Sequence, residues 1–498
     1  MNFGIIKKTI GWMLLFEACF FLVPLITAAV YWEAEFFAFL ICIGICAAVG
    51  GLCLIGKPKS DKIYAKEGFV ITALCWIVLS AFGALPFVMA GTIPNYVDAL
   101  FETVSGFSTT GASIIDPAVG VESLPKCMLM WRSFTHWVGG MGVLVFIMAF
   151  LPLSGARNMH IMKAESPGPT VGKLVPKVRT TAKILYIIYG TFTLLEFIML
   201  LCGKMPLFDA INTAFATAGT GGFAVKNSGF AGYNSYLQIV VTVFMFIFSI
   251  NFNAYYMIVK RKWKEILTEE IKWFLVIVVL AISAITLNVF LTETVNAMGD
   301  KMRFGEALKH AAFSVATVVS TTGFATEDFS QWPAFSQVIL VGLMFMGACA
   351  GSTGGGIKVS RLLLLGKSAN NEIGKMLHPK QVKRVTMDGR VIDEDVVRSI
   401  LGYMIAYVTI FIISFAIISL DLDNLSHGNS SAFATGFTAV TATLNNIGPG
   451  LGAVGPAGSF HDFSWWSKLV FIFDMLAGRL EIFPMLLLFA PLTWKKGA

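Results

Sequence analysis

Long apolar blocks separated by short polar segments make up most of this chain. A helix that crosses a lipid bilayer needs about 20 apolar residues, and the blocks have this length. The pattern predicts an all-α polytopic membrane protein with ten candidate spans. They occupy residues 10–32, 36–56, 68–92, 127–153, 183–203, 235–259, 273–295, 397–420, 466–494 and, with an interruption, 334–365.

The composition agrees with a chain that is largely surrounded by lipid. Of its 498 residues, 56% are hydrophobic and only 13% are charged, with a mean hydropathy of +0.74. A soluble domain usually carries about 25% charged residues. The chain therefore lacks the polar surface that would let it face water on all sides.

Basic residues gather in alternate segments between the predicted spans. Most of the 37 Lys and Arg residues lie at the N-terminus, in 57–66, 157–183, 260–272 and 358–398, and at the C-terminus. Because Lys and Arg stay on the cytoplasmic side, we expect both termini to be cytoplasmic. The net charge of +7 follows from this topology and does not indicate nucleic-acid binding.

Four internal segments resemble one another. Each begins with a weakly apolar, helix-like stretch and ends in a small-residue tripeptide that contains Gly. These stretches are too short to cross a membrane, so we expect four pore helices that enter it from the extracellular side. The segments are Asp98–Ser113, Asp209–Ala224, Glu306–Ala325 and Ser431–Gly450.

The repeated unit is a span, a pore helix, a Gly-containing loop and a second span. Four such units surround one central pore in the predicted fold, and a two-span hairpin precedes them. The predicted boundaries are 1–56 for the hairpin and 57–153, 154–260, 261–395 and 396–498 for the pore repeats.

The chemistry of the four loops favours a potassium filter. A cation that loses water needs replacement oxygens, and non-helical backbone survives at membrane depth where it lines a cavity. Gly permits the required dihedral angles, and potassium filters use four copies of such a loop around an axis. One such motif alone would suggest only close helix packing, but four in register indicate a filter. The predicted potassium-binding residues are Thr109, Thr110 and Gly111; Thr220, Gly221 and Gly222; Thr321, Thr322 and Gly323; and Asn446, Ile447 and Gly448.

At these residues the sequence resembles the superfamily of Trk, Ktr and HKT potassium transporters, and its TrkH branch in particular. The resemblance covers essentially the whole chain. It is carried by STTGA at 108–112, STTGF at 320–324, TLNNIGPGLG at 443–452 and AGRLEIFP at 477–484.

The resemblance implies several properties. It implies a homodimer in the inner membrane of a prokaryote and a cytoplasmic, nucleotide-binding regulatory subunit of the TrkA type. Gly in all four filter loops favours potassium, since Ser at the first position accompanies sodium selectivity in plant relatives. In the second repeat Gly219, Gly221 and Gly222 compete for the filter position. Gly222 is preferred because it precedes Phe223, as Gly323 precedes Phe324.

The interrupted block 334–365 predicts a broken span. Each Gly costs about 1 kcal/mol inside a helix, so we expect one helix to end near Phe345 and another to begin after Gly356. In the family this position carries an intramembrane loop that gates the pore. The gate residues so predicted are Gly347, Gly351, Ser352, Thr353, Gly354, Gly355, Gly356 and Lys358, together with Arg479.

Two polar residues inside apolar blocks have alternative interpretations. Arg479 either pairs with Asp474 or Glu481, or stands beside the pore and contacts carbonyl groups of the 347–356 loop, because an intramembrane charge faces a partner or a cavity. His136 either relays protons or packs against a neighbouring helix, and packing is the more common role.

The sequence leaves several functional questions open. Transport is either channel-like or coupled to protons or sodium, and a sodium-permeable or ammonium-permeable relative is the alternative function. The six His residues are scattered, and the eight Cys residues show no metal-binding spacing, which argues against an enzyme and against a bound cofactor other than the transported ion. We expect the regulator to dock on the basic loops 366–395 and 260–272.

Overall fold

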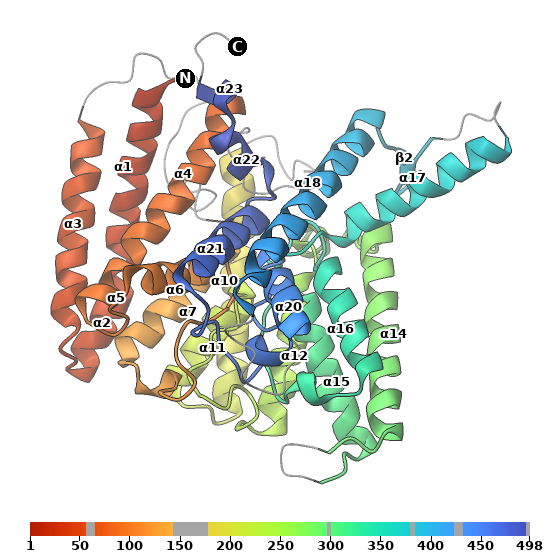
Figure 1. Cartoon of the computed structure of the whole chain (residues 1–498), viewed down its shortest axis with the longest axis horizontal. Helices are drawn as coiled ribbons and strands as arrows, with labels where there is room; N and C mark the ends of the chain where they lie inside the picture. The colour runs from red at the N-terminus through yellow and green to blue at the C-terminus, as the bar shows by residue number, and fades with distance from the viewer. Residues whose placement is uncertain (56–64, 143–177, 296–299, 379–383, 423–431, 495–498) are drawn as a thin grey trace.

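A computed structural model describes residues 1–55, 65–142, 178–295, 300–378, 384–422 and 432–494. The described chain is helical almost throughout (Figure 1). Its two named strands, β1 (Thr386–Met387) and β2 (Arg390–Val391), form one small hairpin. Parts of the predictions lie outside the described residues. These parts are 57–64, most of 157–183, the end of the block at 127–153, Lys380, Lys383, Lys495 and Lys496.

An N-terminal helical hairpin precedes the repeats. It contains α1 (Phe3–Phe20), α2 (Leu22–Tyr31) and α3 (Phe36–Leu54). Helices α1 and α3 cross at Gly11 and Gly50, where a Cβ on Gly11 would lie 2.9 Å from the Gly50 carbonyl oxygen. Small residues at such crossings allow close packing of membrane helices.

Four helical units follow the hairpin. The first contains α4 (Ala65–Gly83), α5 (Leu85–Met89), α6 (Tyr96–Phe107) and α7 (Lys126–Gly140). The second contains α10 (Val178–Cys202), α11 (Leu207–Gly219), α12 (Ser235–Ser249) and α13 (Phe252–Val259). The third contains α14 (Glu269–Leu291), α15 (Phe304–Val319), α16 (Ala334–Met346) and α17 (Val359–Leu377). The fourth contains α18 (Glu394–Ser419), α20 (Ala432–Leu444), α21 (Trp465–Arg479), α22 (Phe483–Phe489) and α23 (Pro491–Trp494).

Proline sets the start of several of these helices. Pro125, Pro206 and Pro333 immediately precede α7, α11 and α16, with φ between −53° and −55°. The ring fixes φ near the helical value and contributes no backbone donor that would need a partner. The chain can therefore turn from a surface loop directly into a helix at these points.

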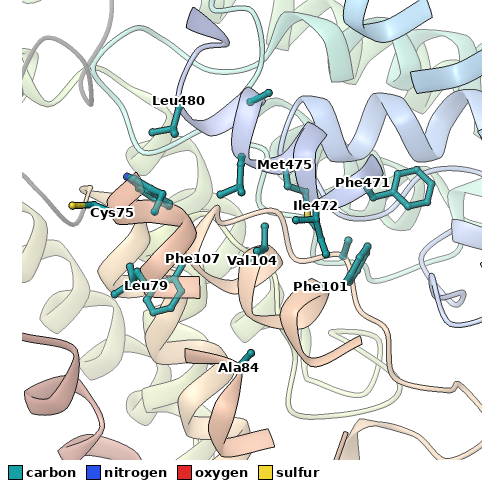
Figure 2. Close-up of a cluster of buried hydrophobic side chains, with 14 of the residues drawn as sticks. Cys75, Leu79, Ala84, Phe101, Val104, Phe107, Phe471, Ile472, Met475 and Leu480 are labelled. Carbon is teal, nitrogen blue, oxygen red and sulfur yellow. The ribbon is translucent and has the colours of Figure 1, made fainter. Parts of the chain in front are cut away.

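The apolar core joins the first repeat to the last. Figure 2 shows Phe101, Val104 and Phe107 of α6 between Cys75 and Leu79 of α4 on one side and residues of α21 on the other. The labelled residues of α21 are Phe471, Ile472 and Met475. The pore helix of repeat one thus packs against the second span of repeat four, which closes the circle of repeats.

The structure corrects two of the ten predicted spans, which are broken rather than continuous. Among the described residues, six helices are long and apolar enough to cross a membrane, and the bent pair α12–α13 would make seven. The continuous span predicted at 235–259 is wrong, because α12 and α13 meet at an angle of 91°. The continuous span predicted at 466–494 is also wrong, because α21 ends at Arg479 and α22 begins at Phe483.

All four second spans end at corresponding places. Helices α7, α12, α16 and α21 have 15, 15, 13 and 15 residues. At a rise of about 1.5 Å per residue they are shorter than the ~30 Å hydrocarbon layer. In each repeat the second helix therefore ends before it has crossed the hydrocarbon layer. The break predicted in 334–365 is thus one of four such breaks.

Candidate functional site

Four glycine loops follow the pore helices and have one common backbone shape. We use this name for residues 109–111, 220–222, 321–323 and 446–448. The first residue of each loop is left-handed, with φ of 58°, 54°, 59° and 55°. The third is Gly, with φ of 77°, 77°, 90° and 95° at Gly111, Gly222, Gly323 and Gly448. In the second repeat this pattern falls on Gly222 rather than on Gly219 or Gly221.

The same hydrogen bond ends each pore helix. The backbone N–H of the middle loop residue donates to the carbonyl five residues earlier, as in a helix terminus with a left-handed cap. The four pairs are Thr110 to Ser105 at 2.9 Å, Gly221 to Ala216 at 2.9 Å, Thr322 to Thr317 at 2.8 Å and Ile447 to Ala442 at 2.9 Å. This equivalence shows that the four segments are structural repeats.

The four loops form a closed ring. A Cβ placed on each loop Gly would meet the carbonyl oxygen of the middle residue in the next repeat. These contacts are Gly111 to Gly221 at 1.8 Å, Gly222 to Thr322 at 2.0 Å, Gly323 to Ile447 at 2.3 Å and Gly448 to Thr110 at 2.7 Å. Only Gly combines this close approach with positive φ.

Side-chain hydrogen bonds stabilise three of the glycine loops. Ser108 bonds to Thr110 at 2.7 Å, and Ser320 bonds to Thr322 at 2.6 Å. Asn446 donates to the Thr110 hydroxyl at 2.9 Å, which ties the fourth loop to the first. All of these side chains are fully buried, so the bonds hold the loops without competition from water.

A vestibule opens on one side of the ring. This cavity of 340 Å³ is lined by all four loop glycines and by acidic side chains from the segments that follow them. Asp116, Glu327 and Asp328 contribute carboxylates, which raise the local concentration of cations. Arg132 and Lys226 also line the cavity. The Arg132 guanidinium forms a buried ion pair with Glu102 at 2.7 Å, and the Lys226 ammonium lies 4.3 Å from the Tyr233 ring.

The segment between α16 and α17, residues 347–358, lies against the opposite side of the ring. The Gly355 N–H donates to the Thr321 hydroxyl at 2.7 Å. Cβ atoms on Gly354 and Gly355 would lie 2.8 Å from the Ser320 carbonyl and 2.3 Å from the Asn445 carbonyl. The segment therefore bonds to the third glycine loop and lies close to the residues that directly precede the third and fourth loops.

Arg479 contacts carbonyl groups from two other repeats. Its Nη1 donates to the Thr353 carbonyl at 2.9 Å, and its Nη2 donates to the carbonyls of Gly139 and Gly140 at 2.5 and 2.7 Å. The partners considered from the sequence are engaged elsewhere. Asp474 accepts from Ser414 at 2.7 Å, and Glu481 pairs with Arg361.

Lys358 is nearly fully buried at the end of the same segment. Its φ is 80°, and its Nζ donates to the carbonyl of Gly354. The side chain thus folds back and closes the segment on itself. Ser352 likewise donates to the Cys349 carbonyl at 2.6 Å, and Thr353 donates to the Phe248 carbonyl at 3.2 Å.

Comparison with known sequences decides the family. The family model TrkH, described as a cation transport protein, matches residues 35–496. This chain belongs to the TrkH family. The prediction of the TrkH branch is confirmed.

Relatives match the TrkH-family chain over its full length. It is 33% identical to the Trk system potassium uptake protein TrkH of Salmonella typhimurium (strain LT2), with 100% of both chains covered. It is 32% identical to the Trk system potassium uptake protein TrkG of Escherichia coli (strain K12), with 99% of this chain and 98% of that one covered.

A solved structure also matches. The crystal structure of the potassium transporter TrkH from Vibrio parahaemolyticus has a TM-score of 0.85 and 31% sequence identity, and the match covers 99% of this chain and 100% of that one. The predicted helical polytopic membrane fold is thereby confirmed.

Two buried carboxylates hold this part of the TrkH-family fold. Sequence reasoning missed Glu270 and considered Glu481 only as a partner of Arg479. Glu270 of α14 accepts from the N–H groups of Ala350 and Ser360, at 2.7 and 3.1 Å, and so ties the 347–358 segment and the first turn of α17 to α14. Glu481 binds Arg361 of α17, whose guanidinium lies 4.3 Å from the Tyr403 ring. The available signal was an acidic residue next to an apolar block, which identifies no partner.

Proposed function

We propose that this chain conducts potassium ions across the cytoplasmic membrane through the ring of glycine loops. The observation that carries the proposal is the ring itself, in which each loop Gly abuts a carbonyl of the next repeat. Rings of backbone carbonyls replace the hydration shell of potassium. The names of the relatives, which are potassium uptake proteins, support the same ion. Potassium is thus the substrate, held at the filter residues named above, and the chain is a transporter rather than an enzyme.

In this proposal the 347–358 segment is the gate. Gly355 bonds to Thr321 of the third glycine loop, and Gly354 and Gly355 lie close to the carbonyls of Ser320 and Asn445, which directly precede the third and fourth loops, opposite the vestibule. Arg479 ties the segment to the end of α7. An ion that leaves the ring on this side meets the segment, so conduction requires that the segment move.

Rubidium uptake into proteoliposomes tests the proposal. We expect uptake by the purified chain, strong competition by potassium and at least about tenfold weaker competition by sodium, equivalent to about 1.4 kcal/mol of differential binding. Equal competition by sodium or ammonium would favour the alternative, a sodium-permeable or ammonium-permeable member of the family. Vesicles without protein supply the background.

Orientation and assembly belong to the same proposal. The start of α1 and the last described helix, α23, lie at one end of the molecule in Figure 1, which supports the prediction that both termini are cytoplasmic. We further propose an inner-membrane location, a homodimer and a TrkA-type nucleotide-binding regulator. These follow from the resemblance to the family.

The two loops proposed for the regulator contact each other. Glu269, at the start of α14, pairs with Lys367 of α17 and accepts from the Asp388 N–H at 3.2 Å. The Asp388 carboxylate accepts in return from the Glu269 N–H at 2.6 Å. Residues 260–272 and the β1–β2 hairpin therefore form one surface. Exposed basic residues on it are Lys260, Arg261, Lys262, Lys264, Lys375, Arg384 and Arg390.

Neutralising Lys380, Lys383 and Arg384 together should weaken binding of the regulator about tenfold, since each exposed ion pair contributes about 0.2–1 kcal/mol. Co-purification and flux with regulator and nucleotide are the measurements. A matched control neutralises the exposed residues Lys204, Lys301 and Arg303, which lie outside both loops and remove the same charge. Equal loss of binding in both variants would mean that net charge, not this surface, drives association.

A further inference from the structure

His136 of α7 bridges two repeats next to the ring. Its Nδ1 lies 2.7 Å from the carbonyl oxygen of Gly106 in pore helix α6. Its Nε2 accepts from the N–H of Phe223, the residue after the second glycine loop, at 3.3 Å. The side chain is fully buried. A single imidazole thus connects the first repeat to the loop of the second.

The two partners require one form of the ring. A carbonyl oxygen only accepts, so Nδ1 carries the proton, and a backbone N–H only donates, so Nε2 must be bare. Both nitrogen atoms of the neutral imidazole are therefore used. A proton relay would have to break one of these bonds at each transfer, which favours the packing interpretation of His136.

The His136 imidazole also occupies the space that a side chain at residue 221 would fill. A Cβ on Gly221 would lie 2.2 Å from Cγ and Nδ1 of His136. The equivalent residues in loops one and three are Thr110 and Thr322, which bond to Ser108 and Ser320. The second loop has Gly219 and Gly221 at these positions and cannot form that bond.

We propose that His136 is a positioning residue that replaces the Ser–Thr support in the second glycine loop and thereby sets ion selectivity. The Gly221 carbonyl oxygen is the atom it positions, and of the four it lies nearest to the Cβ position of the neighbouring loop Gly. Phe223 packs against both the His136 ring, at 4.3 Å, and the Arg132 guanidinium, at 4.0 Å. The inference rests on the proposed function, because it concerns selectivity at the same ring.

Paired substitutions at residues 136 and 221 test this role. We expect His136→Ala to lower the potassium-over-sodium ratio about fivefold or more, within the range of coupling between residues in contact. Gly221→Thr alone should also lower it, because the new side chain collides with the imidazole. The double variant His136→Ala with Gly221→Thr should recover to within about threefold of the parent, since the Thr then occupies the vacated space.

The control and the conservative variants separate positioning from general stability. Trp137→Phe removes a hydrogen bond to Thr193 from the next residue of α7 and should leave the ratio unchanged. His136→Gln keeps a polar group near the Nε2 position and should retain more selectivity than His136→Asn, which keeps one near Nδ1. This comparison remains decisive if the Ala variant does not fold.

The outcomes are distinguishable from failure of the proposed function. A selective parent with an unchanged His136→Ala ratio, a double variant no better than the worse single one, or Asn equal to Gln would each overturn the role of His136. A parent that passes potassium and sodium equally would overturn the proposed function and this inference together.

Discussion

Replacing Arg479 with Ala should raise basal rubidium flux about tenfold or more in the absence of any regulator. The guanidinium forms three hydrogen bonds to backbone carbonyls of residues 353, 139 and 140. A hydrogen bond to a charged group contributes about 1.5–3 kcal/mol, and about 1.4 kcal/mol shifts an equilibrium tenfold. Loss of the bond to Thr353 alone would therefore shift the gate segment about tenfold or more toward a displaced position, although its other hydrogen bonds remain.

A second variant distinguishes a steric gate from an electrostatic one. Removing a positive charge beside a cation pathway would itself increase flux. Arg479→Gln removes the charge but keeps amide donors, so it should raise flux less than Ala if the segment is a physical obstruction. Equal increases in Gln and Ala would indicate that the charge, and not the segment, limits the flux.

Deletion of residues 350–355 should raise basal flux as well, because it removes the Thr353 and Gly355 contacts.

Lys468→Met is the matched control for the Arg479 variants. It removes a buried cation from the other end of α21, where Lys468 pairs with Asp98 at 2.8 Å, without touching the segment. Correctly folded gate variants that conduct no better than the parent would show that 347–358 is not a gate.

The repeat architecture could be predicted because it depends on local signals. Each pore helix is a short apolar stretch that ends in a Gly-containing tripeptide, and each lies between longer apolar blocks. The third loop position has positive φ, which favours Gly. A Gly at this position in each segment therefore predicts the loop conformation from the sequence alone. The choice of Gly222 used only its neighbour Phe223, and the φ pattern of the second loop matches that choice.

The breaks in the second spans of repeats two and four could not be predicted, because distant residues stabilise them. At the α12–α13 bend the freed Ser249 carbonyl accepts from Cys349 N–H at 3.1 Å, and Phe252 N–H donates to the Gly351 carbonyl at 3.0 Å. A window of sequence around residue 250 contains neither partner. The bend is therefore a consequence of tertiary contact with the 347–358 segment.

The break after α21 contradicts local propensity. Glu481 and Ile482 have φ of 52° and 68°, in a region that β-branched residues rarely adopt. The buried pair of Glu481 with Arg361 and the Ile482 N–H bond to the Ala477 carbonyl at 2.7 Å hold this conformation. The sequence left two interpretations for Arg479 because its hydrogen-bond partners, residues 353, 139 and 140, lie more than a hundred residues away in sequence.

Replacing Gly111 with Ser should lower the potassium-over-sodium permeability ratio by about tenfold or more while the protein still inserts. A side chain here meets the Gly221 carbonyl oxygen at 1.8 Å, so that carbonyl must turn or the first loop must shift. Either movement opens the ring at the junction of repeats one and two. A wider or less regular ring no longer matches the potassium ion. It therefore discriminates less against the smaller, more strongly hydrated sodium ion.

Gly91→Ser is the matched control for this experiment. Gly91 has φ of 71°, close to the 77° of Gly111, but nothing lies within 4 Å of its Cβ position. The Gly91→Ser substitution therefore introduces the same backbone strain as Gly111→Ser, of about 1–2 kcal/mol, without a clash in the ring. Reversal potentials in mixed potassium and sodium should shift in Gly111→Ser and stay at the parent value in Gly91→Ser. An unchanged reversal potential in Gly111→Ser would mean that ions do not pass through the ring, whereas equal shifts in both variants would attribute the effect to strain alone.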